Sequence, residues 1–446
     1  MGLADWKKEM PQHYETAARM LGVTENRILG PADHLLKKAA EAAGSGNTFY
    51  CTKVGIFEPA PGEPGNQTFP DPFFGGEGPA RTTCTACGGC IMGCRYGAKN
   101  TLDLGYLYLA EKHGAQVFPE SKVVNVKPLG GSSDGSAGYE VHTVKSTAWI
   151  RRQPRRFTCR GVIFAASSLG TMELLFQLRE NRSLPAISGQ LGQHVRTNSE
   201  SLIGARTPGY TQDLSQGIAI GSGVYIDEHT HIEAVRYPKG SDAMGFLTTI
   251  LTDGRPGPQR IALWLKNIVA SLLRHPFKTM RVLQPVGWAR EFVILLCMQA
   301  LDGEIEMRWQ RPWFWPFRKF LVSRGAKVPT YIPKANEFAK RFAQLTGGFA
   351  MSLLPEILFD VPGTAHCIGG CVIADCSCRG VVDSRHRVFN YKNMYICDGS
   401  VVAANLGVNP SLTITALAER AMSFIPPVGK TSWDNSAGEV ADPVVA

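Results

Sequence analysis

The sequence predicts a mixed α/β fold, and three patterns point to it. The β-rich run at 155–166 leads through a short turn into a helical stretch at 171–179, which makes a strand–turn–helix unit. The run at 393–400 leads in the same way toward a helix that begins near Pro410. Two β-rich runs, at 115–129 and 139–146, precede the first unit with hairpin-like spacing. Strand–turn–helix units around a β-meander are typical of dinucleotide-binding α/β domains.

The N-terminal third adds helices and a long loop. Helical stretches are predicted at 6–23 and 31–44, and a further helix at 102–113. Residues 55–82 are rich in Gly and Pro without periodicity, which predicts a long ordered loop or lid. From about residue 190 to 380 the pattern changes. Strand-like runs at 231–252 and 292–309 flank an amphipathic helix at 258–276.

Size and composition limit the class of protein. A chain of 446 residues exceeds one typical core, so two interleaved domains are expected. The net charge is +9, but no run of Lys or Arg exceeds two, so we predict no nucleic-acid partner. A basic surface suits anionic lipid instead. Residues 1–20 lack an apolar signal core, which predicts a cytoplasmic protein whose twelve cysteines are reduced thiols.

The predicted C-terminal helix has a start that suits an anion. Asn409 is placed to cap it, and Pro410 takes its first position. A helix N-terminus carries about half a unit of positive charge, so an anionic ring or a phosphate fits there. Asp398, just upstream, is placed to accept a hydrogen bond from a sugar hydroxyl. An ordinary capped helix after an ordinary strand is the alternative.

These segments resemble the C-terminal signature of the glucose–methanol–choline (GMC) family of flavin oxidoreductases. They read GTAHCIGGC at 363–371 and DGSVVAANLGVNPSLTITALAERA at 398–421, and they are most similar to the steroid (cholesterol oxidase) branch. PDPFFGGEGPARTTC at 70–84 and CGGCIMGCRYGAKNTLDLGYLYLAEKHGAQV at 87–117 resemble the same branch. The likeness extends from residue 1 to about 425. It implies an N-terminally truncated, Rossmann-like FAD-binding domain with an antiparallel-sheet substrate domain.

The resemblance also implies domain limits. Residues 85–190 and 380–426 correspond to the FAD-binding domain, in which the first βαβ unit is absent. Residues 1–84 and 191–379 correspond to the substrate-binding domain and lid. A loose polar tail is expected at 427–446.

The implied reaction is oxidation of the CH–OH group of a sterol or another bulky alcohol, by hydride transfer to flavin N5 with oxygen as acceptor. The resemblance places the catalytic histidine at His366 and a partner asparagine at Asn409. Histidine titrates near neutrality and can take a hydroxyl proton. Asn409 can donate a hydrogen bond to the developing oxygen charge. A structural or metal-bound His366 is the alternative, and the capping role of Asn409 is compatible with the catalytic one.

Steroid oxidases also use a glutamate to move the double bond of the product. Glu291, beside the apolar run at 292–298, is the candidate here, and Glu304 is the second. A surface carboxylate is the alternative for both. The cofactor contacts implied by the resemblance are Val124, Ala166, Asp398, Gly399, Asn409, Pro410 and Ser411. Ser167 stands where relatives often carry glycine.

A family motif is missing from this sequence. GMC enzymes begin with a strand, a G-x-G-x-x-G turn and a helix, but Gly44-Ser45-Gly46 and Gly221-Ser222-Gly223 lack the third glycine. We therefore expect a fragment, a misassigned start or one part of a split gene, with a separate N-terminal FAD-binding fragment as partner. The chain alone is expected to bind FAD weakly or not at all. An inactive remnant is a further alternative.

Two cysteine groups offer a different class of function. Cys84, Cys87, Cys90 and Cys94 have the C-x2-C-x2-C-x3-C spacing of bacterial ferredoxins, which would make an iron–sulfur or zinc-binding electron-transfer protein. Arg95 stands where those ferredoxins have Pro, and there is no second copy, so buried thiols are our interpretation. A second set, Cys367, Cys371, Cys376 and Cys378, is too irregular for a zinc site. We predict no bound metal.

The middle of the chain indicates a lipid-like substrate. GFLTTIL at 245–251 and LWLKNIVASLL at 263–273 are apolar, and the segment 313–320 mixes aromatic and cationic residues as interfacial anchors do. A 3β-hydroxysteroid fits such a surface better than a sugar does. We interpret 313–320 as an ordinary aromatic core segment, with peripheral membrane contact as the alternative.

Overall fold

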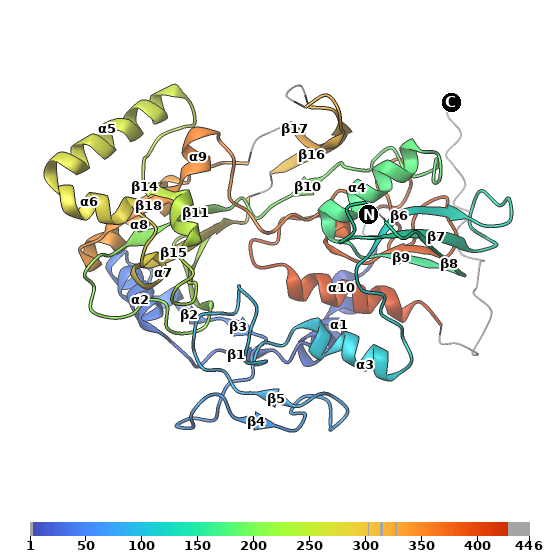
Figure 1. Cartoon of the computed structure of the whole chain (residues 1–446), viewed down its shortest axis with the longest axis horizontal. Coiled ribbons are helices and arrows are strands. Elements are labelled where there is room, and N and C mark those ends of the chain that lie inside the picture. The colour runs from blue at the N-terminus through green and yellow to red at the C-terminus, as the bar shows by residue number, and fades with distance from the viewer. Residues whose placement is uncertain (1–2, 151, 302, 313–314, 326–327, 427–446) are drawn as a thin grey trace.

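The computed structural model describes residues 3–150, 152–301, 303–312, 315–325 and 328–426 (Figure 1). It has the predicted mixed α/β fold with antiparallel sheets. The helices are α1 (Trp6–Met20), α2 (Pro31–Ala42), α3 (Tyr106–Lys112), α4 (Ser167–Glu180), α5 (Pro258–Arg274), α6 (Pro276–Leu283), α7 (Trp288–Glu291), α8 (Pro333–Thr346), α9 (Leu354–Leu358) and α10 (Ser411–Ser423). Short 3-10 helices lie at Gly46–Thr48, Leu102–Leu104, Ala243–Leu247 and Gly399–Val401.

The strands fall into several sheets. They are β1 (Thr24–Glu25), β2 (Tyr50–Cys51), β3 (Lys53–Val54), β4 (Thr68–Phe69), β5 (Arg81–Thr82), β6 (Ser121–Pro128), β7 (Tyr139–Lys145), β8 (Arg155–Cys159), β9 (Val162–Phe164), β10 (Val195–Arg196), β11 (Ser201–Arg206), β12 (Ile220–Tyr225), β13 (Thr230–Val235), β14 (Thr248–Ile250), β15 (Phe292–Gln299), β16 (Glu304–Gln310), β17 (Phe320–Gly325), β18 (Phe349–Leu353) and β19 (Met394–Ile396).

The largest sheet is antiparallel, with its strands in the order β14-β18-β11-β15-β13-β12-β2. Its central strand β15 reads FVILLCMQ and is buried up to its last residue, because strands pair with both of its edges and side chains cover both of its faces. On one face, α2 and α8 cover the sheet. Leu36 of α2 and Phe342 of α8 share a buried cluster there with Leu295 of β15.

The other face of this sheet carries polar as well as apolar side chains. Side chains alternate along a strand, so His231, Glu233 and Val235 of β13 point to the same face. His231 lies opposite Met298 and Glu233 opposite Leu296, so these two β15 residues share that face. Part of the face is covered by α6 and α7. The candidate site lies here.

A second region contains the predicted β-meander and strand–turn–helix units (Figure 1). β6, β7 and β8 form an antiparallel sheet, and β9 and β19 form a separate parallel pair. Met172 of α4 packs against Phe164 of β9 and Ile396 of β19 in one buried cluster. Within the described ranges β9 pairs only with β19, and its Ile163 is 48% exposed. α10 and α1 pack together beside this region.

Three predicted elements have different limits in the structure. The helix predicted at 171–179 begins already at Ser167, which has a left-handed φ of 67°. The helix predicted at 102–113 is divided, because Gly105 has φ −131° and ψ −100° between a 3-10 turn and α3. The strand predicted at 155–166 is divided into β8 and β9, which belong to different sheets.

The prediction that all cysteines are reduced is wrong for two of them. Cys376 and Cys378 form a disulfide, with their Cα atoms 5.3 Å apart. A tight turn brings them together, because the amides of Arg379 and Gly380 both donate to the carbonyl of Cys376. The remaining ten cysteines are free thiols. The one-residue spacing between these cysteines did not predict the disulfide, because the prediction of reduced thiols depended only on the expected cellular compartment.

Some predictions fall partly outside the described ranges. The tail predicted at 427–446 and the aromatic pair Trp313 and Phe314 lie there. The lid predicted at 55–82 is described and contains the short hairpin of β4 and β5. No helix in the described part of the chain is both long enough and apolar enough to cross a bilayer.

Candidate active site

His366 lies in the loop between α9 and β19, with its side chain 14% exposed. Its Nδ1 contacts Oε1 of Glu200, and the other carboxylate oxygen accepts from the Ala365 amide at 3.1 Å. A carboxylate accepts hydrogen bonds, so the proton of the neutral ring lies on Nδ1. Nε2 then carries the lone pair. The arrangement prepares His366 to accept a proton at Nε2.

The protonation of His366 depends on two opposing influences. Burial lowers its pKa to about 4, because the charged ring would lose hydration. The carboxylate of Glu200, which is 1% exposed, favours the charged ring. We take burial as the larger influence, so the ring is neutral and basic at pH 7.

Asn198 connects His366 to the loop that precedes α10. Its Nδ2 lies 3.2 Å from Nδ1 of His366 and donates to the carbonyl of Val408 at 2.7 Å. Val408 is the neighbour of Asn409, so a single side chain separates His366 from this loop. The Oδ1 of Asn198 is buried and has no hydrogen-bond partner among the described residues. A polar atom left in this state is typical of a binding site.

Asn409 does not cap α10, which corrects the sequence prediction. The residue before α10 is Pro410, and no side chain caps the helix. The Nδ2 of Asn409 instead donates to both oxygens of Glu233, at 3.1 and 2.9 Å. The carboxamide is therefore directed away from the helix and toward the sheet. The first amides of α10 are left without a capping side chain.

Glu233 is the most perturbed carboxyl group near this loop. It is 3% exposed on β13, and burial raises its pKa to about 7, against the opposing effect of the Asn409 hydrogen bond. Beside it, His231 is also buried, which lowers its pKa to about 4. Tyr50 hydrogen-bonds Nε2 of His231 and stacks on its ring. A buried carboxyl that titrates near pH 7 can both take up and release a proton.

The two glutamates predicted from the sequence are in ion pairs elsewhere. Glu291 ends α7 and pairs with Arg206 at 3.1 Å and with Arg281 at 2.7 Å. Glu304 pairs with His194 and Arg196 and is half-exposed. Neither has a hydrogen bond to His366 or Asn409. Both assignments stay predictions, but the geometry favours Glu233 over either for moving a proton.

The described residues fit the ring end of a flavin. The uncapped N-terminus of α10 presents free amides and a positive dipole end next to Asn409, with Ser411 exposed, which suits the pyrimidine oxygens of a reduced ring. Ala166 and Ser167 are also exposed, at the turn from β9 into α4. Asn198, whose Oδ1 has no hydrogen-bond partner among the described residues, contacts both His366 and the Val408 carbonyl.

The other predicted cofactor residues have varied surroundings. Both oxygens of Asp398 are engaged, with Thr171 at 2.5 Å and with the amide and hydroxyl of Ser400 at 2.9 and 2.6 Å. A Cβ on Gly399 would meet the side chains of Ile414 and Ser168 at 3.1 Å, so a larger residue there would require both to shift. Val124 is half-buried on β6. These contacts hold the β19–α10 connection in shape around the site.

The cysteine motif does not form a metal group. In the described ranges, no three His, Cys, Asp or Glu side chains are arranged to hold a metal ion. Cys84 is buried in an apolar cluster with Ile56, Ala98 and Ile218, and burial raises the pKa of its thiol to about 11. A neutral, buried thiol is a poor metal ligand. The structure gives no support to the electron-transfer alternative.

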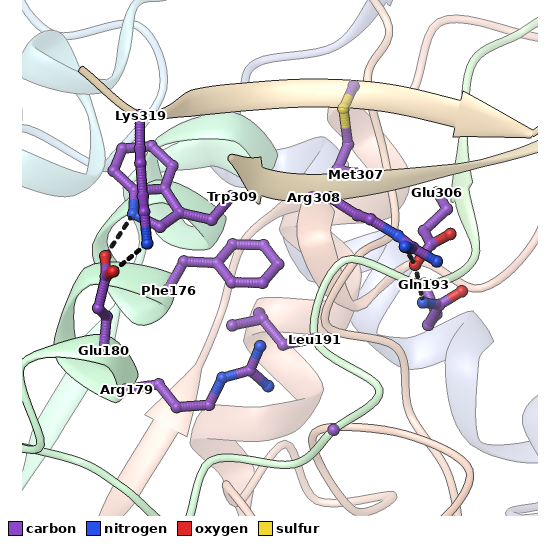
Figure 2. Close-up of a pocket in the computed structure, with 11 residues that line it drawn as sticks. Phe176, Arg179, Glu180, Leu191, Gln193, Glu306, Met307, Arg308, Trp309 and Lys319 are labelled. Atoms are coloured by element: carbon purple, nitrogen blue, oxygen red, sulfur yellow. Dashed lines mark hydrogen bonds and ion pairs between the residues drawn. The ribbon is translucent and has the colours of Figure 1, made fainter. Parts of the chain in front are cut away.

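A separate cavity of about 400 Å³ lies between α4, the 189–193 loop and the β16–β17 hairpin (Figure 2). Four of its charged side chains are paired with one another, Glu180 with Lys319 and Glu306 with Arg308 at 2.7 Å, and Arg179 donates to the carbonyl of Ser188 at 2.9 Å. Neither His366 nor Asn409 lines it. The cavity therefore is not part of the candidate active site.

Sequence reasoning missed Glu200, Asn198 and Glu233. Glu233 did leave a signal, because HIEAV places two ionisable residues on one face of an otherwise apolar strand. Glu200 and Asn198 belong to the irregular run TNSE between β10 and β11, where no periodicity marks them. Only the fold brings this run against the 363–371 loop.

Comparison with known proteins supports the resemblance seen in the sequence. The family model described as GMC oxidoreductase matches residues 325–418. A cholesterol oxidase of Acinetobacter baumannii is 59% identical over 423 residues, which cover 95% of this chain and 75% of that protein. A cholesterol oxidase of Mycobacterium tuberculosis (strain CDC 1551 / Oshkosh) is 44% identical over 452 residues, covering 98% of this chain and 75% of that protein.

Similar solved structures are more distant. Pyridoxine 4-oxidase from Mesorbium loti has a TM-score of 0.48 and 12% sequence identity, covering 90% of this chain and 71% of that one. An FAD-dependent oxidoreductase from Chaetomium thermophilum also has a TM-score of 0.48, with 11% identity and 90% and 72% coverage.

Proposed function

Because this chain belongs to the GMC oxidoreductase family, we propose that it oxidises the CH–OH group of a sterol, with FAD as its cofactor. Enzymes of this family are generally FAD flavoproteins. The sterol is suggested by the similarity to two cholesterol oxidases. The observation that carries the proposal is that Asn198 contacts both His366 and the carbonyl of Val408, whose neighbour Asn409 donates to the buried Glu233.

His366 is the base in this proposal. Its Nδ1–H is held by Glu200, so Nε2 accepts the hydroxyl proton of the alcohol. FAD, when bound, supplies the acceptor for the hydride that leaves the same carbon. Asn198 lies between the His366 ring and the loop that precedes α10, to which it donates through the Val408 carbonyl, and the uncapped α10 stabilises negative charge that develops beside it.

Glu233 is proposed to move the double bond after oxidation. A 3-keto product with a neighbouring double bond is isomerised by removing a proton from the carbon between them and returning it two carbons further on. A base for this step must gain and lose a proton near neutral pH. Burial gives Glu233 a pKa of about 7, and the two hydrogen bonds from Asn409 fix the position of its carboxylate.

The apolar residues around Glu233 support a steroid rather than a sugar. Leu296 and Met298 share its face of the sheet, and Val235 follows on the same strand. A sugar on this face would leave several hydroxyl groups without partners, which is costly in a buried site. A steroid has a single hydroxyl and an apolar body, and it matches such a lining.

The test is a substrate comparison with FAD kept in excess. A 3β-hydroxysteroid, a sugar alcohol and a long-chain alcohol are each offered with oxygen or with a reducible dye, and the products are identified by chromatography. We expect the steroid to give a 3-keto product whose double bond has moved. His366→Gln should lose at least about a hundredfold in rate, and His113→Gln, at an exposed position, is the matched control. Oxidation of the sugar alcohol in preference to the steroid would overturn the assignment.

A further inference from the structure

Helices α5 and α6 form a projecting hairpin at one end of the molecule (Figure 1), and its outward side is apolar. On α5, Leu265, Val269 and Leu273 repeat every four residues and are 52, 55 and 80% exposed. On α6, Phe277 and Met280 are 86 and 63% exposed. We call these five residues the outer stripe. Soluble helices normally turn such a face inward, so the outer stripe is a candidate binding surface.

Three uncharged side chains of α5 with polar groups form hydrogen bonds to the rest of the protein. Trp264 donates from Nε1 to the hydroxyl of Thr249 at 2.9 Å, and Asn267 donates to the hydroxyl of Thr252 at 3.3 Å. At the other end, Ser271 shares a hydrogen bond of 2.7 Å with Thr279 of α6. These bonds fix the rotation of α5, so the outer stripe stays outward.

The charge of the hairpin is of one sign. Residues 256–286 contain no Asp or Glu, but they contain five Lys and Arg residues. Arg260 is buried, and Arg281 is paired with Glu291. The other three are the exposed Lys266, Arg274 and Lys278, and no ion pair joins them to any described residue. An apolar stripe flanked by unpaired cations complements an anionic lipid surface.

A second copy of the chain is a poorer occupant for this surface. In a two-fold dimer the same patch meets itself, so the three unpaired cations would face their own copies. The whole chain also carries a net charge of +9, which disfavours self-association through its basic parts. At a bilayer the same cations meet phosphates, and their long side chains reach the headgroups while the apolar residues insert.

We propose that α5 and α6 dock the protein on the surface of an anionic lipid bilayer. The outer stripe lies among the acyl chains, and Lys266, Arg274 and Lys278 contact the headgroups. α5 has 17 residues with cations at both its middle and its end, so it lies along the membrane plane and does not cross it. Docking needs neither flavin nor substrate, so it goes beyond the proposed reaction and can be tested apart from it.

The test is flotation of the purified chain with lipid vesicles. One set is phosphatidylcholine, and the other is an equimolar mixture of phosphatidylcholine and phosphatidylglycerol. We expect binding to the mixed vesicles, weakened by added salt. Leu273→Ser with Phe277→Ser should weaken it at least about tenfold. Ile150→Ser, at a position 93% exposed in the β7–β8 turn, is the matched control and should leave binding unchanged.

Charge is tested with a second matched pair. Replacing Lys266, Arg274 and Lys278 by Gln should weaken binding by about a hundredfold, because each cation near an anionic surface strengthens binding about fivefold. Replacing the exposed Lys7, Lys38 and Lys53 by Gln removes the same net charge elsewhere and should have little effect. All these positions are exposed, so far-ultraviolet circular dichroism should be the same for every variant.

Three results would overturn the proposal. The first is equal binding to both vesicle types. The second is loss of binding in Phe317→Ser, at a position 84% exposed, with no loss in the outer-stripe variant; this would place the contact at the β16–β17 hairpin. The third is a dimer in solution that the outer-stripe variant dissociates without lipid, which would make the surface a protein–protein interface.

Discussion

Glu233→Gln should stabilise the protein at alkaline pH and not at acidic pH. In the folded chain burial raises the pKa of Glu233 from 4.5 to about 7, so the folded state holds this proton more tightly than the unfolded state does. Stability is therefore lost as the pH rises from about 4.5 to about 7, and the loss is complete above that range. At about 1.4 kcal/mol for each pKa unit, the ionised carboxylate costs about 3 kcal/mol.

The glutamine variant avoids this cost but loses part of a hydrogen-bonded contact. Asn409 donates to both oxygens of Glu233, and a carboxamide can accept at only one atom, which costs about 1 kcal/mol. The net gain is about 2 kcal/mol near pH 8 and about zero near pH 5. Urea unfolding of the flavin-free chain at the two pH values measures it. An equal difference between variant and parent at both pH values would refute the reasoning.

Glu291→Gln is the contrasting control, because it should destabilise at both pH values. Its carboxylate pairs with Arg206, whose side chain is fully buried. Removing the charge leaves a buried guanidinium without its counter-ion, at a cost of about 3 kcal/mol. The two variants are expected to change the free energy of unfolding in opposite directions at alkaline pH. Such a result would distinguish a carboxyl whose ionisation destabilises the fold, Glu233, from one whose ion pairs stabilise it, Glu291.

Three further predictions concern the site and the cysteines. With FAD in excess, kcat/KM for a sterol should rise as the pH passes about 4 and then stay level to neutrality, because burial lowers the pKa of His366 to about 4. A rise centred near pH 7 would show that the Glu200 carboxylate affects the pKa of His366 more strongly than burial does. The chain purified alone should lose flavin on dialysis, as measured by fluorescence, and one flavin retained per chain would contradict this. Thiol titration of the unfolded chain should find ten free cysteines before reduction and twelve after it, and twelve at the start would exclude the Cys376–Cys378 disulfide.

The elements of the fold were largely predictable, because their patterns are local. The helix at 258–276 and the strand-like run at 292–309 follow from spacing and apolar content, and the structure has them as α5 and as two strands, β15 and β16. The split of residues 155–166 into β8 and β9 was not predictable in this way. Both halves read as strand, and only tertiary pairing assigns them to different sheets.

The candidate site likewise contains residues that a local motif predicts and residues that only the fold brings together. His366 and Asn409 were found through motifs near the C-terminus, where the chain has a distinctive local sequence. Glu233 and Glu200 act through burial and contacts that other segments provide, and no local pattern encodes their surroundings. The capping role predicted for Asn409 failed for the same reason. Asn409 lies one residue before the cap position, which Pro410 takes, and its Nδ2 donates to a buried carboxylate of β13.

The parallel pair of β9 and β19 has a consequence for handling this protein. Among the residues described, the strand that contains Ile163 forms backbone hydrogen bonds along one edge only, and the Ile163 side chain is 48% exposed. Such a strand is a template for another polypeptide to extend. In dilute solution the backbone amide of Ile163 should exchange with deuterium quickly. At high concentration the same strand is where copies would begin to aggregate, unless a further strand completes the sheet.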